Sequence, residues 1–86
     1  MESQETHPIY SFPKNQDEEV RLEVRKYKGK YYIDLRVWFK GESSEVYRPT
    51  KKGVIFGLDQ YSELRKGVDR LAKAADRFHS KQEMEA

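Results

Sequence analysis

The strongest constraint on the fold is a pair of alternating segments on either side of Lys28-Gly29. Apolar residues recur there at every second position, the pattern of a half-buried β-strand: Val20, Leu22 and Val24 before the turn, and Ile33, Leu35, Val37 and Phe39 after it. Glycine permits the positive φ that a two-residue hairpin turn needs. With Lys28-Gly29 as that turn, paired residue numbers sum to 57, and three apolar pairs fall on one face. Turn and alternation therefore agree on a β-hairpin.

The other face of this predicted hairpin is charged. It sets Arg21 opposite Arg36 and Glu23 opposite Asp34. Directly opposed like charges destabilise a sheet, so the arginine pair favours a surface that receives an anion. The two carboxylates resemble a paired catalytic site, but the arginines that flank them favour a balanced charge lattice. Because the sequence also lacks cysteine and a glycine-rich phosphate loop, we expect no enzyme activity, no cofactor and no metal site.

The rest of the chain is divided into an arm, a folded domain and a tail. Residues 1–17 contain two prolines and no periodicity, and we expect a flexible acidic arm there. The folded domain is expected over residues 18–79, and a flexible tail over 80–86. Beyond the hairpin we expect a short strand at 45–48, and a basic turn at 51–53 precedes a last strand at 54–56.

A helix is predicted from about residue 58 to 79, with Gly57 at its start and Asp59 in its first turn, where the helix dipole favours an acid. Its apolar residues are spaced by three and four positions: Tyr61, Leu64, Val68, Leu71, Ala75 and Phe78. This stripe packs either on the hairpin of its own chain or on its copy in a dimer. The predicted fold class is α+β, a curved four-stranded antiparallel sheet followed by one C-terminal helix.

The size of the chain favours association. With 86 residues, of which 36% are hydrophobic and 37% charged, it builds a thin core. Disulfides are excluded, so a partner chain is the remaining support. We therefore expect a homodimer with its interface on Tyr61, Leu64, Val68, Leu71 and Phe78. No apolar run reaches the roughly 20 residues of a membrane span, and the N-terminus lacks the signal-peptide pattern. An intracellular location is expected, in the cytoplasm or nucleoid, or in the nucleus of a eukaryote.

Charge is distributed unevenly along the sequence. Residues 1–19 carry a net charge of −4, residues 20–58 carry +6, and residues 59–86 are neutral, which together give the total of +2. A basic segment next to an acidic one points to a polyanionic partner.

Aromatic residues are interleaved with the cations of this basic segment. Tyr27, Tyr31, Tyr32, Trp38 and Phe39 lie among Arg25, Lys26, Lys28, Lys30 and Arg36. Unpaired bases stack on aromatic rings while Lys and Arg follow the phosphates, so the sheet is the candidate surface for single-stranded nucleic acid. The alternative is that some of these rings only pack. Trp38, on the polar face, is the hardest of them to explain as packing.

Two segments of the sequence resemble the conserved core of the transcriptional coactivator positive cofactor 4 family. They are Tyr27-Lys28-Gly29-Lys30-Tyr31-Tyr32-Ile33-Asp34-Leu35-Arg36, followed by an aromatic residue, and Arg48-Pro49-Thr50-Lys51-Lys52-Gly53-Val54. The resemblance covers about residues 18–79. It implies a dimer whose two basic channels accept single-stranded DNA.

The same resemblance implies roles for individual residues. Tyr27 and an aromatic after Arg36 would stack bases, while phosphates or base edges would be contacted by Lys28, Lys30, Arg36, Arg48, Lys51 and Lys52. Arg25 joins this group through its place in the basic segment. Alternation and bacterial relatives favour Trp38 as the second ring, and the eukaryotic pattern favours Phe39, so Trp38 is the first choice. Glu18 stands where the family has a basic residue, which weakens that end of the channel.

The sequence therefore predicts a homodimeric single-stranded-DNA-binding protein of low sequence preference that acts in transcription regulation or in replication and repair. Its short acidic arm favours a general binder of bacterial or viral type over a mediator at promoters. Transcription or replication proteins are the expected further partners. A protein-interaction module that docks an acidic partner and an RNA-binding, chaperone-like protein are the alternatives.

Overall fold

The predicted hairpin forms the centre of the molecule. Strands β2 (Glu18–Tyr27) and β3 (Lys30–Phe39) are joined by Lys28 and Gly29, whose φ angles are 50° and 79°. Two positive φ values are typical of a type I′ turn, whose twist matches that of the strands. The strands pair in the predicted register, including Val24 with Ile33. The hairpin and its register are confirmed.

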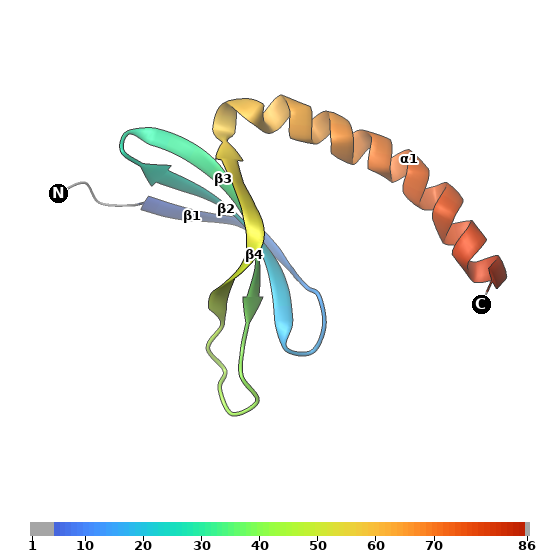
Figure 1. The fold of residues 1–86 in the computed structure, drawn as a ribbon, viewed down its shortest axis with the longest axis horizontal. Helices are drawn as coiled ribbons and strands as arrows, with labels where there is room; N and C mark the ends of the chain where they lie inside the picture. Colours follow the sequence, from blue (N-terminus) through green and yellow to red (C-terminus); the bar gives the residue numbers. More distant parts are fainter. Residues whose placement is uncertain (1–4, 86) are drawn as a thin grey trace.

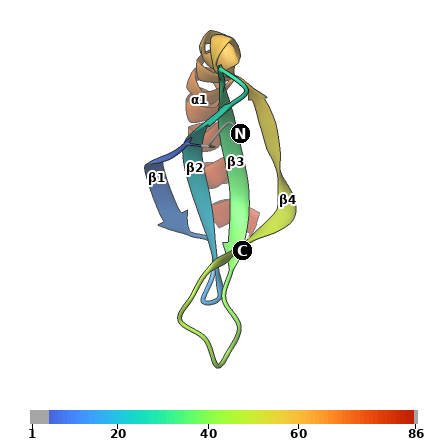
Figure 2. The ribbon, with the colours of Figure 1, turned by 90° about the vertical axis from the view of Figure 1, so that its left-hand side faces the viewer.

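A four-stranded antiparallel sheet grows around this hairpin in the order β1-β2-β3-β4 (Figure 1). Strands β1 (Glu5–Pro13) and β4 (Arg48–Gly57) form its edges. The computed structural model describes the backbone of residues 5–85 and the side chains of residues 5–79 and 81. The predicted class, an open curved antiparallel sheet followed by one C-terminal helix, is confirmed (Figure 2).

The expectation of a flexible arm is wrong for residues 5–13, which form β1; residues 1–4 lie outside the described residues. The register of β1 against β2 shifts between Pro8 and Tyr10. This irregularity inserts Ile9 and breaks the alternation by which strands are recognised in a sequence. Tyr10 still pairs with Leu22, so β1 adds apolar surface to the hairpin.

The expected order of strand, turn and strand over residues 45–56 is also wrong. A single strand, β4, includes the residues predicted as a basic turn, and residues 44–47 lie in the loop before it. Pro49 is compatible with this strand because β4 is a sheet edge, where a missing ladder hydrogen bond is tolerated. All three prolines of the sequence, Pro8, Pro13 and Pro49, lie in the two edge strands.

The C-terminal segment begins as predicted, with Gly57 as N-cap of a short 3-10 turn, η1 (Leu58–Gln60), and Asp59 inside it. Helix α1 (Tyr61–Glu85) follows. The expected flexible tail is wrong for residues 80–85, which continue the helix, and Ala86 lies outside the described residues. Lys, Gln, Glu and Met, the residues found there, are good helix formers.

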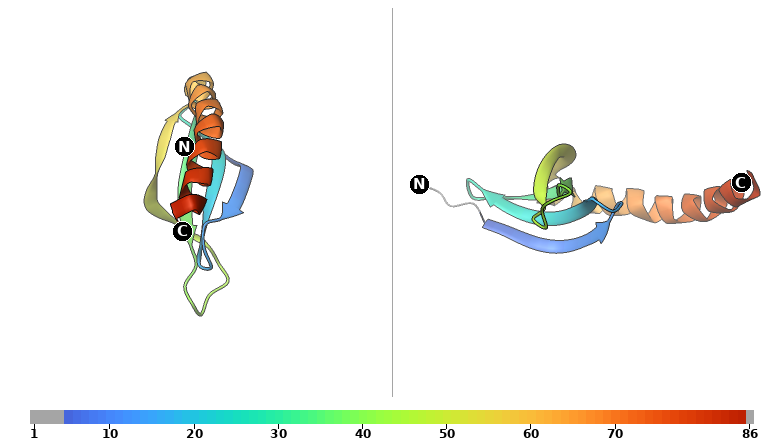
Figure 3. Two further views of the ribbon diagram at one scale, coloured as in Figure 1. Left: turned by 90° about the vertical axis from the view of Figure 1, so that its right-hand side faces the viewer. Right: turned by 90° about the horizontal axis from the view of Figure 1, so that it is seen from below.

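Helix α1 extends away from the sheet (Figures 1 and 3). The radius of gyration is 16.2 Å, whereas a compact domain of this length has about 12 Å. The apolar stripe is open, with Leu71 63% exposed, so the alternative in which it packs on its own hairpin is wrong. Among the hydrophobic residues that the structure describes, Ile33 alone is buried. None of the described helices is long and apolar enough to cross a membrane.

Candidate nucleic-acid interface

The hairpin presents two chemically different faces because side chains alternate along each strand. The arginine face is defined by Arg21, Glu23, Arg25 and Tyr27 of β2 together with Tyr32, Asp34, Arg36 and Trp38 of β3. The apolar face is defined by Val20, Leu22, Val24, Ile33, Leu35 and Val37. Lys30, the register partner of Tyr27, lies on the arginine face as well. Five of the predicted binding residues are therefore brought to the same face: Arg25, Tyr27, Lys30, Arg36 and Trp38.

Two carboxylates are buried in the middle of the arginine face. Asp34 is 2% exposed and Glu23 is 6% exposed. Arg25 contacts both: its Nη2 lies 3.2 Å from Glu23 Oε1, and its Nε lies 2.8 Å from Asp34 Oδ2. The Nε contact is electrostatic, because its alignment does not make a hydrogen bond. Arg36 donates from Nε to Asp34 Oδ1 at 3.1 Å.

This arrangement is the balanced lattice that the sequence predicts, with the two arginines held in place by their shared acid. Arg36 also donates from Nη1 to the Thr50 carbonyl oxygen at 2.8 Å, which ties β3 to β4. A buried carboxylate without a partner is strongly unfavourable, and Asp34 is compensated by two guanidinium groups, one on each of its oxygens. The sequence does not predict that the lattice is buried. The feature of the sequence that indicates the lattice itself is the alternation of Arg with Asp or Glu on the same face of both strands.

Tyr27 lies at the turn end of the arginine face and is 45% exposed. The Lys28 ammonium is 5.3 Å from the centre of its ring. A hollow of about 360 Å³ opens beside it, lined by Arg25, Lys26, Tyr27, Tyr32 and Ile55. An exposed ring beside cations is the arrangement that stacks a base and holds its phosphate.

Trp38 lies at the other end of the arginine face and is half-buried. The Arg21 guanidinium lies 4.1 Å from the centre of the Trp38 ring and 5.4 Å from that of Tyr47, a loop residue. The indole Nε1 is buried and has no hydrogen-bond partner among the described residues. The sequence predicts Arg21 only as the partner of Arg36 at an anion-receiving surface, and it does not predict the contact of Arg21 with Trp38. Tyr47 is not predicted for the site.

Phe39, the second choice for the stacking ring, points to the opposite side of the sheet from Trp38 because the two residues are consecutive in β3. It is 46% exposed and lines a hollow of about 560 Å³ with Lys52 and Glu18. Asn15 Nδ2 donates to Glu18 Oε1 at 2.7 Å. This hydrogen bond, followed by that from Lys14, holds the pKa of Glu18 below its usual value. An ionised acid therefore stands at this end of the sheet.

The remaining predicted cations are exposed but spread over two places. Lys28 and Lys30 lie at the hairpin turn, while Arg48, Lys51 and Lys52 lie in β4. The register of β4 against β3 shifts beside these residues, between the pairs of Arg36 and Trp38. At Gly53 the strands approach so closely that an added Cβ would lie 2.7 Å from the Leu35 carbonyl oxygen and 3.0 Å from Arg36 Cα. Gly53 thus allows the backbone of β4 to lie close against Arg36, while Lys52 lines the Phe39 hollow on the other side of the sheet.

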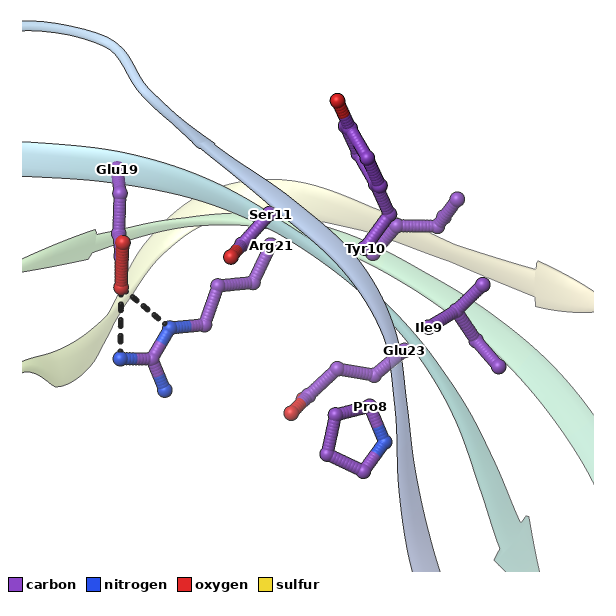
Figure 4. Close-up of a pocket in the computed structure, with 8 residues that line it drawn as sticks. Pro8, Ile9, Tyr10, Ser11, Glu19, Arg21 and Glu23 are labelled. Carbon is purple, nitrogen blue, oxygen red and sulfur yellow. Dashed lines mark hydrogen bonds and ion pairs between the residues drawn. The ribbon is translucent and has the colours of Figure 1, made fainter.

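A third hollow, of about 300 Å³, lies between β1 and β2. Figure 4 shows Glu19 and Arg21 paired at one side of it, with Arg21 Nε donating at 2.9 Å and Nη2 lying 2.8 Å from the same oxygen. Pro8, Ile9, Tyr10 and Ser11 of β1 supply other lining residues. The sequence does not predict this hollow, because the residues of β1 lack the regular alternation of a strand.

Comparison with known proteins assigns this architecture to a class of transcriptional coactivator. The family model for Transcriptional Coactivator p15 (PC4) matches residues 14–67, which is more than half of the sequence. The chain belongs to the PC4 family, and this membership supports the coactivator type of function and DNA binding. The resemblance seen in the sequence is confirmed, and no curated protein sequence matches.

Solved structures show the same fold. A PC4 homologue from Burkholderia pseudomallei K96243, in its tetragonal crystal form, superposes with a TM-score of 0.71 at 19% identity over 79% of this chain and 98% of that one. A bacteriophage T5 homologue of the eukaryotic coactivator PC4, implicated in recombination-dependent DNA replication, superposes with a TM-score of 0.62. It is 24% identical over 93% of this chain and 89% of its own. These homologues are of bacterial and viral type.

Proposed function

We propose that the protein is a non-enzymatic, single-stranded-DNA-binding homodimer of low sequence preference that acts inside the cell in transcription regulation or in replication and repair. The observation that carries this proposal is the exposed Tyr27 ring between Lys28 and the hollow at Arg25. It lies on the same face as Arg36 and Trp38. A strand that follows this face would stack bases at both ends and pass fixed guanidinium groups between them.

Association of two copies is proposed because the chain leaves too much apolar surface in water. The helix stripe that includes Tyr61, Val68, Leu71 and Phe78 is about half exposed or more at each of these residues. Among the described residues, few hydrophobic side chains are buried within the chain itself. A second copy presents the same stripe, and a two-fold axis makes such a surface self-complementary. Sedimentation of the wild-type protein tests this point, and a stable folded monomer would contradict it.

DNA binding is tested by titrating labelled oligonucleotides with the full chain at several salt concentrations. Single-stranded binding should weaken with a slope of about 0.7 in log affinity per log salt for each neutralised phosphate. Absence of binding at low salt would contradict the proposed function. An equal affinity for RNA of the same sequence favours the RNA-binding alternative, and binding of an acidic peptide with no binding of oligonucleotides favours the protein-interaction alternative.

Two matched pairs of variants identify the face that binds. Tyr27 and Tyr31 are 45% and 43% exposed but lie on opposite faces of the hairpin. Tyr27→Ala should weaken single-stranded binding by roughly tenfold, from the loss of about 1–3 kcal/mol of stacking, while Tyr31→Ala should leave it within about twofold. Trp38→Ala and Phe39→Ala form the second pair, and Trp38→Ala is expected to have the larger effect. The reverse order in both pairs would move the binding site to the apolar face.

A further inference from the structure

Helix α1 carries a row of cations that its small total charge conceals, since six Lys/Arg and five Asp/Glu give a net charge of +1. Lys66, Arg70, Lys73, Arg77 and Lys81 are separated by four, three, four and four positions. With 3.6 residues in each turn, this spacing places them on one side of the helix. All five are exposed. We name this row the basic stripe.

Most of the basic stripe has no acidic counterpart. Lys66 lies 3.3 Å from Glu63, but Arg70, Lys73 and Lys81 have no ion pair with any side chain that the structure describes. The acids Asp69 and Asp76 border the stripe, four positions before and three positions after Lys73, but the ion pair of Asp69 is with Arg65, at 3.9 Å. Among the described side chains, Arg70, Lys73 and Lys81 therefore keep positive charge that no ion pair balances.

The basic stripe stays open when the apolar stripe is covered. At 100° for each residue, the centres of the two stripes are separated by roughly 150° around the helix. A second copy seated on Leu71 and its neighbours would leave Arg70 and Lys73 facing solvent in both chains. The proposed dimer thus presents two basic stripes in addition to its sheets.

The geometry of the stripe indicates the chemistry of its ligand. Residues 66 to 81 span about 22 Å of helix, comparable to about six base pairs of DNA, which rise 3.4 Å each. One ring touches the stripe: the Arg77 guanidinium lies 4.9 Å from the centre of the Phe78 ring, which belongs to the apolar stripe. The proposed dimer would cover Phe78, and among the described residues no ring lies against the other four cations, so the stripe leaves no open ring on which an unpaired base can stack. A surface of this kind contacts a phosphate backbone and ignores the bases.

We propose that the basic stripe of α1 binds the phosphate backbone of the duplex that flanks a single strand held by the sheet. This inference rests on the proposed function, which supplies the single strand bound to the sheet. Duplex DNA is the favoured source of phosphate because its bases are covered and its charge is regularly spaced, as the cations of the stripe are. The protein would then recognise the junction between single-stranded and double-stranded DNA.

The test compares two probes: a 20-nucleotide single strand, and the same strand joined to a duplex of 12 base pairs. The full-length wild type should bind the junction probe roughly tenfold more tightly at low salt, and the triple variant Arg70→Gln, Lys73→Gln, Arg77→Gln should lose that gain. Its salt slope on the junction should fall by about 2–3, and its affinity for the single strand should stay within about twofold. Glutamine is a good helix former, and circular dichroism confirms that the helix is retained.

A matched pair of single variants separates the stripe from general charge. Arg70→Gln removes a cation of the stripe, while Arg65→Gln removes one from another side of the same helix. Arg70→Gln should lower the slope on the junction probe by about 0.9, and Arg65→Gln should leave it unchanged. Equal effects of the two variants, or no gain from the duplex in the wild type, would overturn the proposal.

Other outcomes distinguish this inference from the proposed function. Duplex binding that depends on the three cations, without single-stranded binding by any variant, would support the phosphate contact and overturn the proposed function. Vesicles that contain one-third phosphatidylserine form the last arm, because a basic amphipathic helix also suits an anionic membrane. Vesicle binding lost in the triple variant, with unchanged duplex affinity, would assign the stripe to lipid and overturn the proposal.

Discussion

In the centre of the sheet, Arg25 and Arg36 share the buried carboxylate of Asp34, whereas on α1 Arg70 and Lys73 extend into solvent with no acidic partner among the described side chains. The cations of the sheet and those of the helix therefore differ in how their charge is balanced and in how firmly their side chains are held. In the sheet their charge is balanced and their position is fixed, which suits the orientation of a ligand. On the helix their charge is free and their position is loose, which suits attraction at longer range.

The largest contrast is expected from removing one negative charge in each region. Asp34→Asn should lower the free energy of unfolding by about 3 kcal/mol, because it leaves two guanidinium groups without their shared carboxylate. Asp69→Asn on the helix is the control, and its side chain is 72% exposed. It should change stability by less than about 0.5 kcal/mol. Urea unfolding at one fixed protein concentration measures both, and equal losses would show that the sheet lattice has no special role.

A glycine substitution sharpens the same contrast in backbone packing. Gly53→Ala should destabilise the protein by about 1–3 kcal/mol, because the new Cβ meets the backbone of β3 and the strands must separate. Thermal unfolding measures this loss, and the movement of β4 should also weaken single-stranded binding through Lys51 and Lys52. A neutral Gly53→Ala would mean that β4 does not lie against Arg36 in solution.

The smallest expected effect has the opposite sign. At Gly67 of α1 an added Cβ meets nothing within 4 Å, and alanine is the better helix former by about 1 kcal/mol. Gly67→Ala should therefore raise the unfolding temperature, as measured by circular dichroism. A decrease, together with a weaker dimer in sedimentation, would instead place another backbone against the helix at this position.

The hairpin could be predicted because its determinants are local. Lys28-Gly29 defines the turn, and the alternation of Val20, Leu22 and Val24 then leaves one register in which both strands bury the same face. The start of the helical segment, at Gly57 and Asp59, could be predicted for the same reason, because capping and helix-dipole preferences act within one turn.

The edge strands could not be predicted because their local signals are contradictory. In β1 the shift at Ile9 interrupts the alternation, and prolines suggest an irregular segment. In β4 the sequence Lys51-Lys52-Gly53 resembles a turn, although Gly53 is required by close approach to Arg36. Both strands form because they pair with a neighbouring strand. The residues of that neighbouring strand lie outside any short window of the sequence around β1 or β4.

The sequence predicts which residues share a face of the candidate site better than it predicts how their side chains contact one another. Alternation along β3 placed Arg36 and Trp38 on one face, as the structure has them. That Asp34 would be buried beneath Arg25 and Arg36 depends on the packing of long side chains across strands. The stacking of Arg21 on Trp38 and Tyr47 depends further on the path of the loop before β4.

The prolines of the edge strands limit how the protein can aggregate. An exposed sheet edge is a template on which further chains can add without end. Pro8 and Pro13 in β1, and Pro49 in β4, have no N–H group to donate to an incoming strand. Inner strands β2 and β3 contain no proline. Fibre growth by strand addition is thus disfavoured at both edges, and crowding the protein to high concentration should yield discrete particles that redissolve on dilution.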